Sequence, residues 1–533
     1  MKPGQEGATG SVEQAALPSD REAGVLVHIS SLPGPHGIGD IGDAAQAFLD
    51  TLVQMKFACW QFLPLGPTGY GNSPYQALSS FAGNEMLIGL EPLQREGLLE
   101  PGALREIADA GAPLDSAQLF PQKSRLLDIA AERFLSDMDA ADETEFEAFC
   151  ARHEETWLDE YALYRVLRAQ QGNQPWQRWD HAAAQRDGRY LSSVRKQHGQ
   201  QLIRVRVHQY WFERQWQAVR HAARVRGIRL FGDLPIYVSA DSADAWARRD
   251  LMQVGAGGQA TRVSGVPPDY FNELGQRWGN PLYDWPRHER EGFDWWIRRV
   301  RRAMGQCDLL RLDHFRGFES YWSIPADSPD ARHGQWEPGP GDALFEALRE
   351  ALGSLPLVAE NLGDISDEVE SLRERHGLPG MRVLQFELEN EDFEPAQVEP
   401  GCVLYTGTHD NDTLKGWLDG RGKDTCTAQE RRSARRRARR LTGGRAEELQ
   451  RDLLRLAFSS PARLAIAPIQ DLMGLGSEAR MNTPGEPCEQ WRWRLPDGQP
   501  DHATIDFCAR TVTEASRRPP VALQSGHPTG STR

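Results

Sequence analysis

Short apolar runs recur along the chain, and most of them are continuous rather than alternating with polar residues. Strands that are buried on both faces of a sheet give such runs. Helix-like stretches lie between many of them, for example at 342–353 and at 365–377, and the second ends in Gly377, a residue suited to a helix C-cap. The segments predicted to be strands are 24–30, 58–66, 228–239, 308–315, 355–363, 381–388, 402–410 and 462–474.

Eight buried strands separated by helices predict an α/β fold, the (β/α)8 or TIM barrel. The interval 69–226, between the second and third predicted strands, is far longer than one crossover needs. Apolar residues recur at helical spacing in much of it, including 157–170 and 207–227. We therefore expect one barrel domain over 23–515, interrupted by a helical insertion subdomain at 69–226.

The two ends of the chain, 1–22 and 516–533, are rich in Pro, Gly, Ser and charged residues, so we expect both to be disordered. The first of them lacks the apolar stretch of a signal peptide, and no run reaches the roughly 18 apolar residues that span a bilayer. The seven cysteines are scattered and form no C-x-x-C pair, which predicts neither a zinc site nor a disulfide framework. A cytoplasmic protein that does not enter membranes is expected.

The net charge of −15 at pH 7 argues against nucleic acid as a partner. The arginine-rich run at 431–440 is a local exception, which we interpret as a solvated helix face because acidic residues flank it. Several of the sixteen tryptophans stand beside polar residues, as in GQRWGNPLYDW and EQWRWRL. Flat aromatic rings beside hydrogen-bonding groups suit sugar rings, although large rings also fill large cores.

Acidic residues recur where predicted strands end. Asp233 follows RLFG, Asp313 follows LLRL, Glu360 follows LPLVA and Asp410 follows LYTGTH. Barrel enzymes draw their active-site residues from the carboxyl ends of several strands, so these four acids are expected to converge on one mouth. Each acid taken alone also fits a helix cap or an ion pair, and Asp410 fits an Asx-turn.

Clustered carboxylates suit divalent metal binding, proton sharing between two acids, or glycoside cleavage. Metal binding is disfavoured because the same strand ends carry groups that can be cationic: Arg311, His314, Arg316 and His409. Glycoside cleavage needs one ionised and one protonated carboxyl group. We expect Arg311 to lower the pKa of Asp313, which lies two residues further along the same strand face, and burial to raise the pKa of Glu360. Dinucleotide and Walker motifs are missing from the sequence, so neither a cofactor nor a metal is expected.

Three motifs, RLDHFRG at 311–317, AENLG at 359–363 and GTHDNDT at 407–413, resemble those of the amylomaltase family of 4-α-glucanotransferases, also called disproportionating enzyme or D-enzyme. The resemblance extends over nearly the whole chain, from HISSLPGPHGIGDIG near the start to RMNTPGEPCEQWRWRL near the end. It includes the long motif GVPPDYFNELGQRWGNPLYDW at 265–285.

The resemblance implies roles for individual residues. Asp313 matches the catalytic nucleophile, Glu360 the general acid/base, and Asp410 the third carboxylate, which holds and distorts the donor sugar. Arg311 and His409 match residues that flank that sugar. The segment VPPDYFNELGQRWG at 266–279, after the third strand, resembles a lid loop over the site. Further substrate contacts are implied for Ser73, Tyr75, Asp233, Tyr270, Phe271 and Trp278.

The implied activity is transfer of α-1,4-glucan segments to the 4-hydroxyl of another glucan or of glucose, by a retaining double displacement. The implied partners are maltodextrins and the chains of starch or glycogen. Two positions depart from the family pattern: Gln490 stands where Asn is expected, and the arginine run near Arg435 is not shared. Neither touches the three carboxylates.

Two alternatives remain at this point: an α-glucan hydrolase of the α-amylase type, and a catalytically silent glucan-binding protein. The residues after the eighth predicted strand are too few for the C-terminal β-sandwich that α-amylases usually carry, so none is expected. A silent binding protein would have no need of both a nucleophile and an acid.

Overall fold

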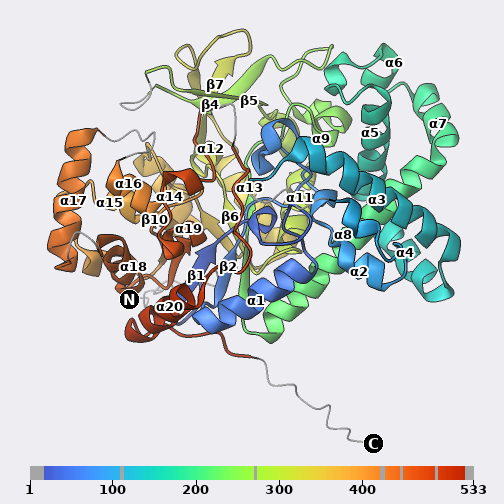
Figure 1. The fold of residues 1–533 in the computed structure, drawn as a ribbon. Coiled ribbons are helices and arrows are strands. Elements are labelled where there is room, and N and C mark those ends of the chain that lie inside the picture. The colour runs from blue at the N-terminus through green and yellow to red at the C-terminus, as the bar shows by residue number, and fades with distance from the viewer. Residues whose placement is uncertain are drawn as a thin grey trace, which may run out of the picture.

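The structure is a computed structural model, and it describes residues 17–107, 113–268, 273–420, 427–444, 448–486 and 490–522. A sheet of eight parallel strands forms its centre, in the order β10-β11-β12-β1-β2-β3-β6-β9 (Figure 1). The strands are β1 (Glu22–Leu26), β2 (Cys59–Gln61), β3 (Arg229–Leu234), β6 (Leu309–Leu312), β9 (Leu357–Ala359), β10 (Gly380–Val383), β11 (Cys402–Tyr405) and β12 (Leu464–Pro468). Each overlaps its predicted segment, so the prediction of eight buried strands is confirmed.

The two outer strands of this order, β9 and β10, approach each other and nearly close the barrel. The amide of Ala359 in β9 donates to the carbonyl of Pro379 at 2.8 Å, just before β10. The side chain of Asn361 accepts from the amide of Met381 in β10, also at 2.8 Å. The (β/α)8 barrel predicted from the sequence is therefore confirmed.

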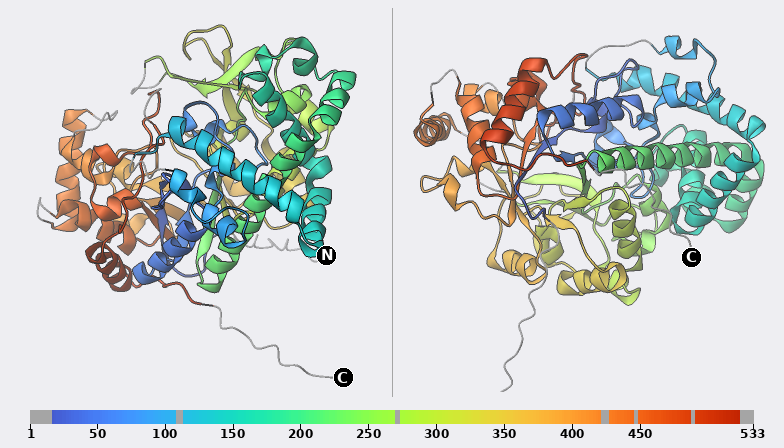
Figure 2. Two further views of the ribbon diagram at one scale, coloured as in Figure 1. Left: turned by 45° about the vertical axis from the view of Figure 1, so that its right-hand side comes forward. Right: turned by 90° about the horizontal axis from the view of Figure 1, so that it is seen from below.

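Helices surround the barrel sheet on its outer side (Figures 1 and 2). Their apolar faces pack on the sheet, and the result is one continuous core that contains residues of nearly every element. These helices are α1 (Asp43–Met55), α11 (Asp294–Met304), α13 (Gly341–Leu352), α14 (Asp367–Arg375), α16 (Leu414–Asp419), α17 (Ala428–Thr442), α18 (Leu449–Ser459) and α20 (His502–Glu514), and shorter ones are α9 (Ala243–Ala247), α10 (Trp285–Arg290), α12 (Arg316–Glu319), α15 (Leu384–Glu387) and α19 (Ile469–Met473).

The chain between β2 and β3 is mainly helical, as predicted, and its helices lie together beside the barrel (Figure 1). Trp176, Trp211 and Trp216 of this segment are fully buried, as are Trp246 and Trp296 elsewhere, so these tryptophans fill the core rather than bind sugar. The helices are α2 (Leu90–Arg95), α3 (Ser116–Asp137), α4 (Ala140–His153), α5 (Asp159–Gln170), α6 (His181–Ala184), α7 (Gly188–Gln197) and α8 (Gly199–Val225).

A second, antiparallel sheet of four strands was not predicted. Its order is β5-β4-β7-β8, from β4 (Arg262–Val266), β5 (Gln276–Pro281), β7 (Ser320–Pro325) and β8 (Gln335–Pro338). The expected lid loop includes the connection between β4 and β5. Tyr270 and Phe271 of that loop lie outside the described residues.

Ordered structure extends beyond the expected domain limits at both ends. Glu22 begins β1, and Arg517, which follows α20, is buried and donates hydrogen bonds to the carbonyls of Glu22 and Phe458. After β12 the described residues contain helices and turns but no strand, and so no β-sandwich. The arginine run lies in α17, in which Ala434 and Ala438 are buried. Among the helices of the described residues, none has the length and apolar character to cross a membrane.

Candidate active site

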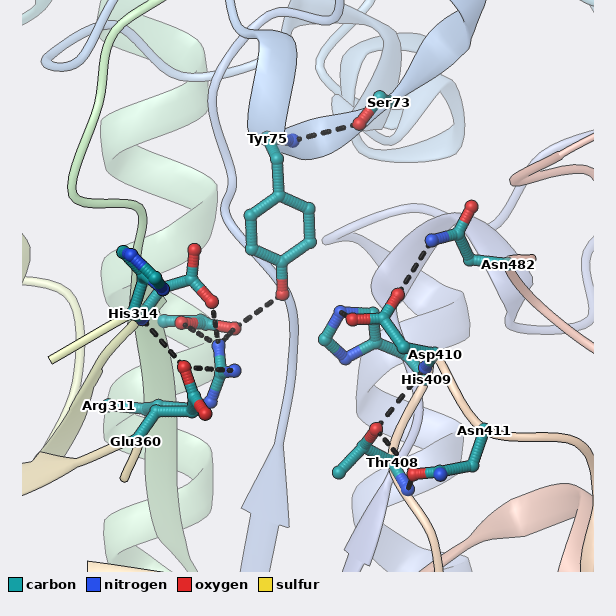
Figure 3. Close-up of polar contacts among 12 residues, drawn as sticks. Ser73, Tyr75, Arg311, His314, Glu360, Thr408, His409, Asp410, Asn411 and Asn482 are labelled. Carbon is teal, nitrogen blue, oxygen red and sulfur yellow. Dashed lines mark hydrogen bonds and ion pairs between the residues drawn. The ribbon is translucent and has the colours of Figure 1, made fainter. Parts of the chain in front are cut away.

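A single buried guanidinium organises the carboxyl ends of three barrel strands. Arg311, the third residue of β6, pairs in register with Asp233 of β3, and its Nη1 contacts the two carboxylate oxygens of Asp233 at 2.9 and 2.8 Å. The same nitrogen lies 2.9 Å from Oδ1 of Asp313, and Nη2 lies 3.9 Å from Oε2 of Glu360 (Figure 3). One cation therefore holds three carboxyl groups together.

The barrel's hydrogen bonding continues past the strand ends and fixes the main chain of the acids. The amide of Asp313 donates to the carbonyl of Leu234 at 3.1 Å, and the amide of Glu360 donates to Leu312 at 3.0 Å. Asp233 has a fully buried side chain, whereas the side chain of Asp313 is 25% exposed. Asp313 is thus open to a ligand, and Asp233 supports the site from beneath.

The main chain of His314 is strained, and its amide binds the carboxyl group of Glu360. Its φ of +51° lies in the left-handed region, which non-glycine residues rarely adopt. In this conformation its amide donates to Oε2 of Glu360 at 2.7 Å, while the amide of Leu362 donates to Oε1 at 2.9 Å. The rings of His314 and of Trp278 from β5 are nearly perpendicular, with centroids 4.8 Å apart. The carboxyl group of Glu360 is therefore held at both oxygens.

The charge balance of this cluster favours retention of protons. Burial raises the pKa of Asp313 to about 8; the Arg311 guanidinium opposes this, and Asp233, Glu360 and Asp410 add to it. Burial also raises the pKa of Glu360, against the effect of Arg311 and of the two amide hydrogen bonds. The expectation of a low pKa at Asp313 was wrong, because burial outweighs the effect of Arg311, whose charge also acts on Asp233. The expected rise at Glu360 is confirmed in direction.

Asp410 lies in a second group of side chains, which is on the other side of Tyr75 from Arg311 (Figure 3). Nε2 of His409 is 3.3 Å from Oδ2 of Asp410, and Asn482 donates to Oδ1 at 2.6 Å. Arg480 donates to the main-chain carbonyl of Asp410 at 2.5 Å. Burial lowers the pKa of His409, which favours a neutral ring. The side chain of Asp410 is 44% exposed, so it is available to a ligand.

Tyr75 joins the two groups. It belongs to a short turn, η3 (Pro74–Gln76), whose N-cap Ser73 accepts the Tyr75 amide at 3.3 Å. The Tyr75 hydroxyl donates to Oδ2 of Asp233 at 2.6 Å. Its ring stacks on His409 with centroids 5.1 Å apart and an angle of 14°, and it also contacts Trp491. Figure 3 shows the ring between the Arg311 and Asp410 sides.

The structure thus gathers most of the residues predicted for the site, and Trp278 reaches it through His314. Tyr270 and Phe271 are the exceptions, since they lie outside the described residues. Those brought together are Ser73, Tyr75, Asp233, Arg311, Asp313, Glu360, His409 and Asp410.

Sequence reasoning missed Arg480, Asn482 and Trp491. All three lie in the motif RMNTPGEPCEQWRWRL, which was a signal for the family but gave no individual roles. Gln490, where Asn was expected, accepts the amide of Thr483 at 2.7 Å and so helps to shape this loop. In the part of the chain that the structure describes, no three His, Cys, Asp or Glu side chains are grouped so that they could hold a metal ion.

Comparison with known proteins places the chain among transferases. Residues 27–500 match the protein family described as 4-alpha-glucanotransferase. The chain is 43% identical over 512 residues to the 4-alpha-glucanotransferase of Thermus thermophilus, which covers 93% of this chain and 99% of that protein. It is 42% identical over 482 residues to the 4-alpha-glucanotransferase of Synechocystis sp., with coverage of 89% and 94%.

The fold is similar to that of solved amylomaltases. The amylomaltase from Streptococcus agalactiae, solved in complex with acarbose, superposes with a TM-score of 0.88 and 34% identity, over 93% of this chain and 100% of that chain. The amylomaltase from Corynebacterium glutamicum, at 18% identity, shares the fold with a TM-score of 0.75, over 93% of this chain and 75% of that chain. Because the family match covers most of its length and these relatives cover nearly all of it, the chain belongs to the 4-alpha-glucanotransferase family.

Proposed function

We propose that this enzyme transfers segments of α-1,4-glucan by a retaining double displacement, with Asp313 as nucleophile and Glu360 as general acid and base. The observation that carries the proposal is the arrangement of both carboxyl groups around one guanidinium, at the ends of neighbouring strands. Retaining enzymes need two carboxyl groups with different protonation states. The raised pKa values of Asp313 and Glu360 let the pair hold one proton near neutral pH.

In the first step, Asp313 attacks the anomeric carbon as Glu360 gives its proton to the departing glycosidic oxygen. The bond between that carbon and oxygen breaks, and its electron pair goes to the oxygen. Arg311 lies closer to Asp313 than to Glu360, at 2.9 against 3.9 Å, and so favours the negative charge on Asp313. The amides of His314 and Leu362 then stabilise the ionised Glu360 that remains.

In the second step, ionised Glu360 takes the proton from the 4-hydroxyl of an acceptor glucan. The acceptor oxygen attacks the same carbon, and Asp313 leaves as a carboxylate. Asp410, held by Asn482 and His409, is the third carboxylate and binds hydroxyl groups of the donor sugar. The stacked ring of Tyr75 borders that sugar.

Transfer requires that an acceptor sugar outcompete water for the covalent intermediate, by proximity and by exclusion of solvent. The transferase names of relatives 42–43% identical to this chain favour transfer over the hydrolase alternative. Because the similar Streptococcus agalactiae amylomaltase was solved in complex with acarbose, that compound is an expected ligand of this site. A cytoplasmic location stays a prediction.

The nucleophile can be identified by trapping. A 5-fluoro-α-glucosyl fluoride forms the intermediate through its good leaving group, and the ring fluorine slows the second step. We expect one sugar to be attached per chain, on the peptide that contains Asp313, as read by mass spectrometry of a protease digest. A label on another acid, or turnover without a covalent adduct, would contradict the assignment.

The pH profile should be bell-shaped with an alkaline limb near pH 8. The raised pKa of Asp313, about 8, means that the pair keeps a proton below that pH and loses it above. At high pH Glu360 then has no proton to give, and at low pH a second proton neutralises Asp313. We would measure kcat/KM for maltotriose from about pH 5 to about pH 10. A rate that stays constant across the alkaline half would exclude the shared proton.

A further inference from the structure

Asp471 is a fully buried carboxylate that the proposed chemistry does not use. It lies in α19, directly after β12, and its exposed fraction is 0%. Its oxygens take separate donors: the Thr406 hydroxyl donates to Oδ2 at 2.6 Å, and the Leu414 amide donates to Oδ1 at 2.6 Å. Both bonds are as short as charge-assisted hydrogen bonds.

The two donors stand at opposite ends of the loop that carries His409 and Asp410. Thr406 directly follows β11, and Leu414 is the first residue of α16. The carboxylate of Asp471 therefore ties the entry of the loop to its exit, and it does so from the helix that follows the neighbouring barrel strand, β12. Thr408, His409, Asp410 and Asn411, which lie between these ends, are on the other side of Tyr75 from Arg311 (Figure 3).

Hydrogen bonds within the loop hold its shape. Asn411 accepts both the amide and the hydroxyl of Thr408 at 2.8 Å, and Thr413 caps α16 by accepting the Gly416 amide. These contacts make 407–413 a unit whose position depends on how it is tied to its neighbours, both at its ends and at Asp410 and Asp412. Besides Asp471, Gln385 donates to the Asp412 carbonyl at 2.9 Å, Ser477 donates to the Asp412 carboxylate at 2.7 Å, and Arg480 donates to the Asp410 carbonyl at 2.5 Å.

Close packing alone does not fix that position. A cavity of about 30 Å³ lies behind the loop and is lined by His28, His409, Asp412 and Asp471, among others. Room for about one or two waters is enough for the loop to shift if its ties are cut. A carboxylate as deeply buried as Asp471 also costs solvation free energy, and neutral side chains could fill the same space. The hydrogen bonds from Thr406 and Leu414 offset this solvation cost.

We propose that Asp471 is a positioning residue for glucan transfer, which sets the place of Asp410 and His409 by clamping both ends of loop 407–413. This inference rests on the proposed function in that Asp410 acts on the donor sugar. Asp471 touches no substrate and acts only through the loop.

The first test compares two substitutions of Asp471. In Asp471→Asn the amide oxygen still accepts from Leu414, and the amide nitrogen can donate to the Thr406 oxygen, so the clamp survives. In Asp471→Ala both donors lose their acceptor. We expect Asp471→Ala to lower kcat about 10- to 100-fold, with the KM of the acceptor glucose unchanged, because a shift of about 1 Å in a catalytic group costs up to about 100-fold. Asp471→Asn should retain kcat to within about threefold.

The second test is a double-mutant cycle with Asp410→Asn. If Asp471 acts through Asp410, Asp471→Ala should lower the rate far less when Asp410 is already replaced. Initial rates are measured as fluoride release from α-maltosyl fluoride, an activated donor that keeps the slow variants measurable. Asp244→Ala is the matched control, since Asp244 in α9 is also buried and accepts a main-chain amide, that of Ser80, at 2.8 Å. It should reduce the rate by the same factor in both backgrounds.

Thermal unfolding of each variant separates misfolding from misplacement. If Asp471→Ala does not fold, Thr406→Val, which removes one donor and keeps the shape, takes its place in the cycle. The proposal would be overturned if the Asp471 or Thr406 substitution lowered the rate by the same factor with Asp410 present and with Asp410→Asn. An unchanged kcat would also overturn it. Fluoride is released in the first step, whether sugar or water accepts the chain in the second. The cycle can therefore still be interpreted if the enzyme proves to be a hydrolase.

Discussion

Replacing Asp313 with alanine should abolish glucan transfer, lowering kcat by about 10⁴-fold or more. The variant keeps Arg311, Asp233 and Glu360, so a donor can still bind, but no carboxylate remains to attack the anomeric carbon. Activity is measured as glucose released from maltotriose.

Azide provides the control for this variant. The space left by the Asp313 side chain opens toward the donor, so added azide can attack an activated α-maltosyl fluoride there. Attack from the nucleophile's side gives a β-glycosyl azide, and Asp313→Asn, which fills the space, should show much weaker rescue. Recovery of an α-linked product, or wild-type transfer by Asp313→Ala, would contradict the role of Asp313.

Replacing Glu360 with glutamine should lower transfer from maltotriose by about 10²- to 10⁴-fold, because the departing sugar oxygen needs its proton. Fluoride leaves with little protonation, so the first step from α-maltosyl fluoride should fall by less than about tenfold. The covalent intermediate then accumulates, since Glu360 is also the base of the second step. Mass spectrometry of the intact protein detects it.

The matched control is Glu370→Gln. Glu370 also supports the AENLG segment, through a 2.7 Å hydrogen bond from Asn361, but its carboxyl group pairs with Arg373. Glu370→Gln should change the rates with maltotriose and with α-maltosyl fluoride by similar factors. Equal losses with maltotriose and α-maltosyl fluoride in Glu360→Gln would show that Glu360 is not the acid.

The barrel could be predicted because burial on both faces leaves a strong mark in the sequence. β6 and β9 consist almost wholly of apolar residues, and an acid follows each of them. The second sheet left no such mark. β5 reads QRWGNP and β8 reads QWEP, so Gly, Pro and polar residues hide strands that are only partly buried.

The acids of the site could be predicted because parallel strands end at one face of the barrel. The partners of those acids could not. Asn482 is 72 residues from Asp410 and Tyr75 is 158 residues from Asp233, and no local pattern connects either pair. The pKa of Asp313 was misjudged for the same reason. Burial, which raises it most, and the presence of Asp233 beside Arg311 both depend on the assembled barrel, where β3 pairs with β6.

The most direct measurement is a product profile from pure maltotriose, resolved by chain length, with reducing ends counted in parallel. Double displacement onto sugar predicts glucose together with a ladder of longer glucans, at a constant number of reducing ends. Reducing ends that rise steadily without longer products would mean that water is the acceptor, and the enzyme would then be a hydrolase.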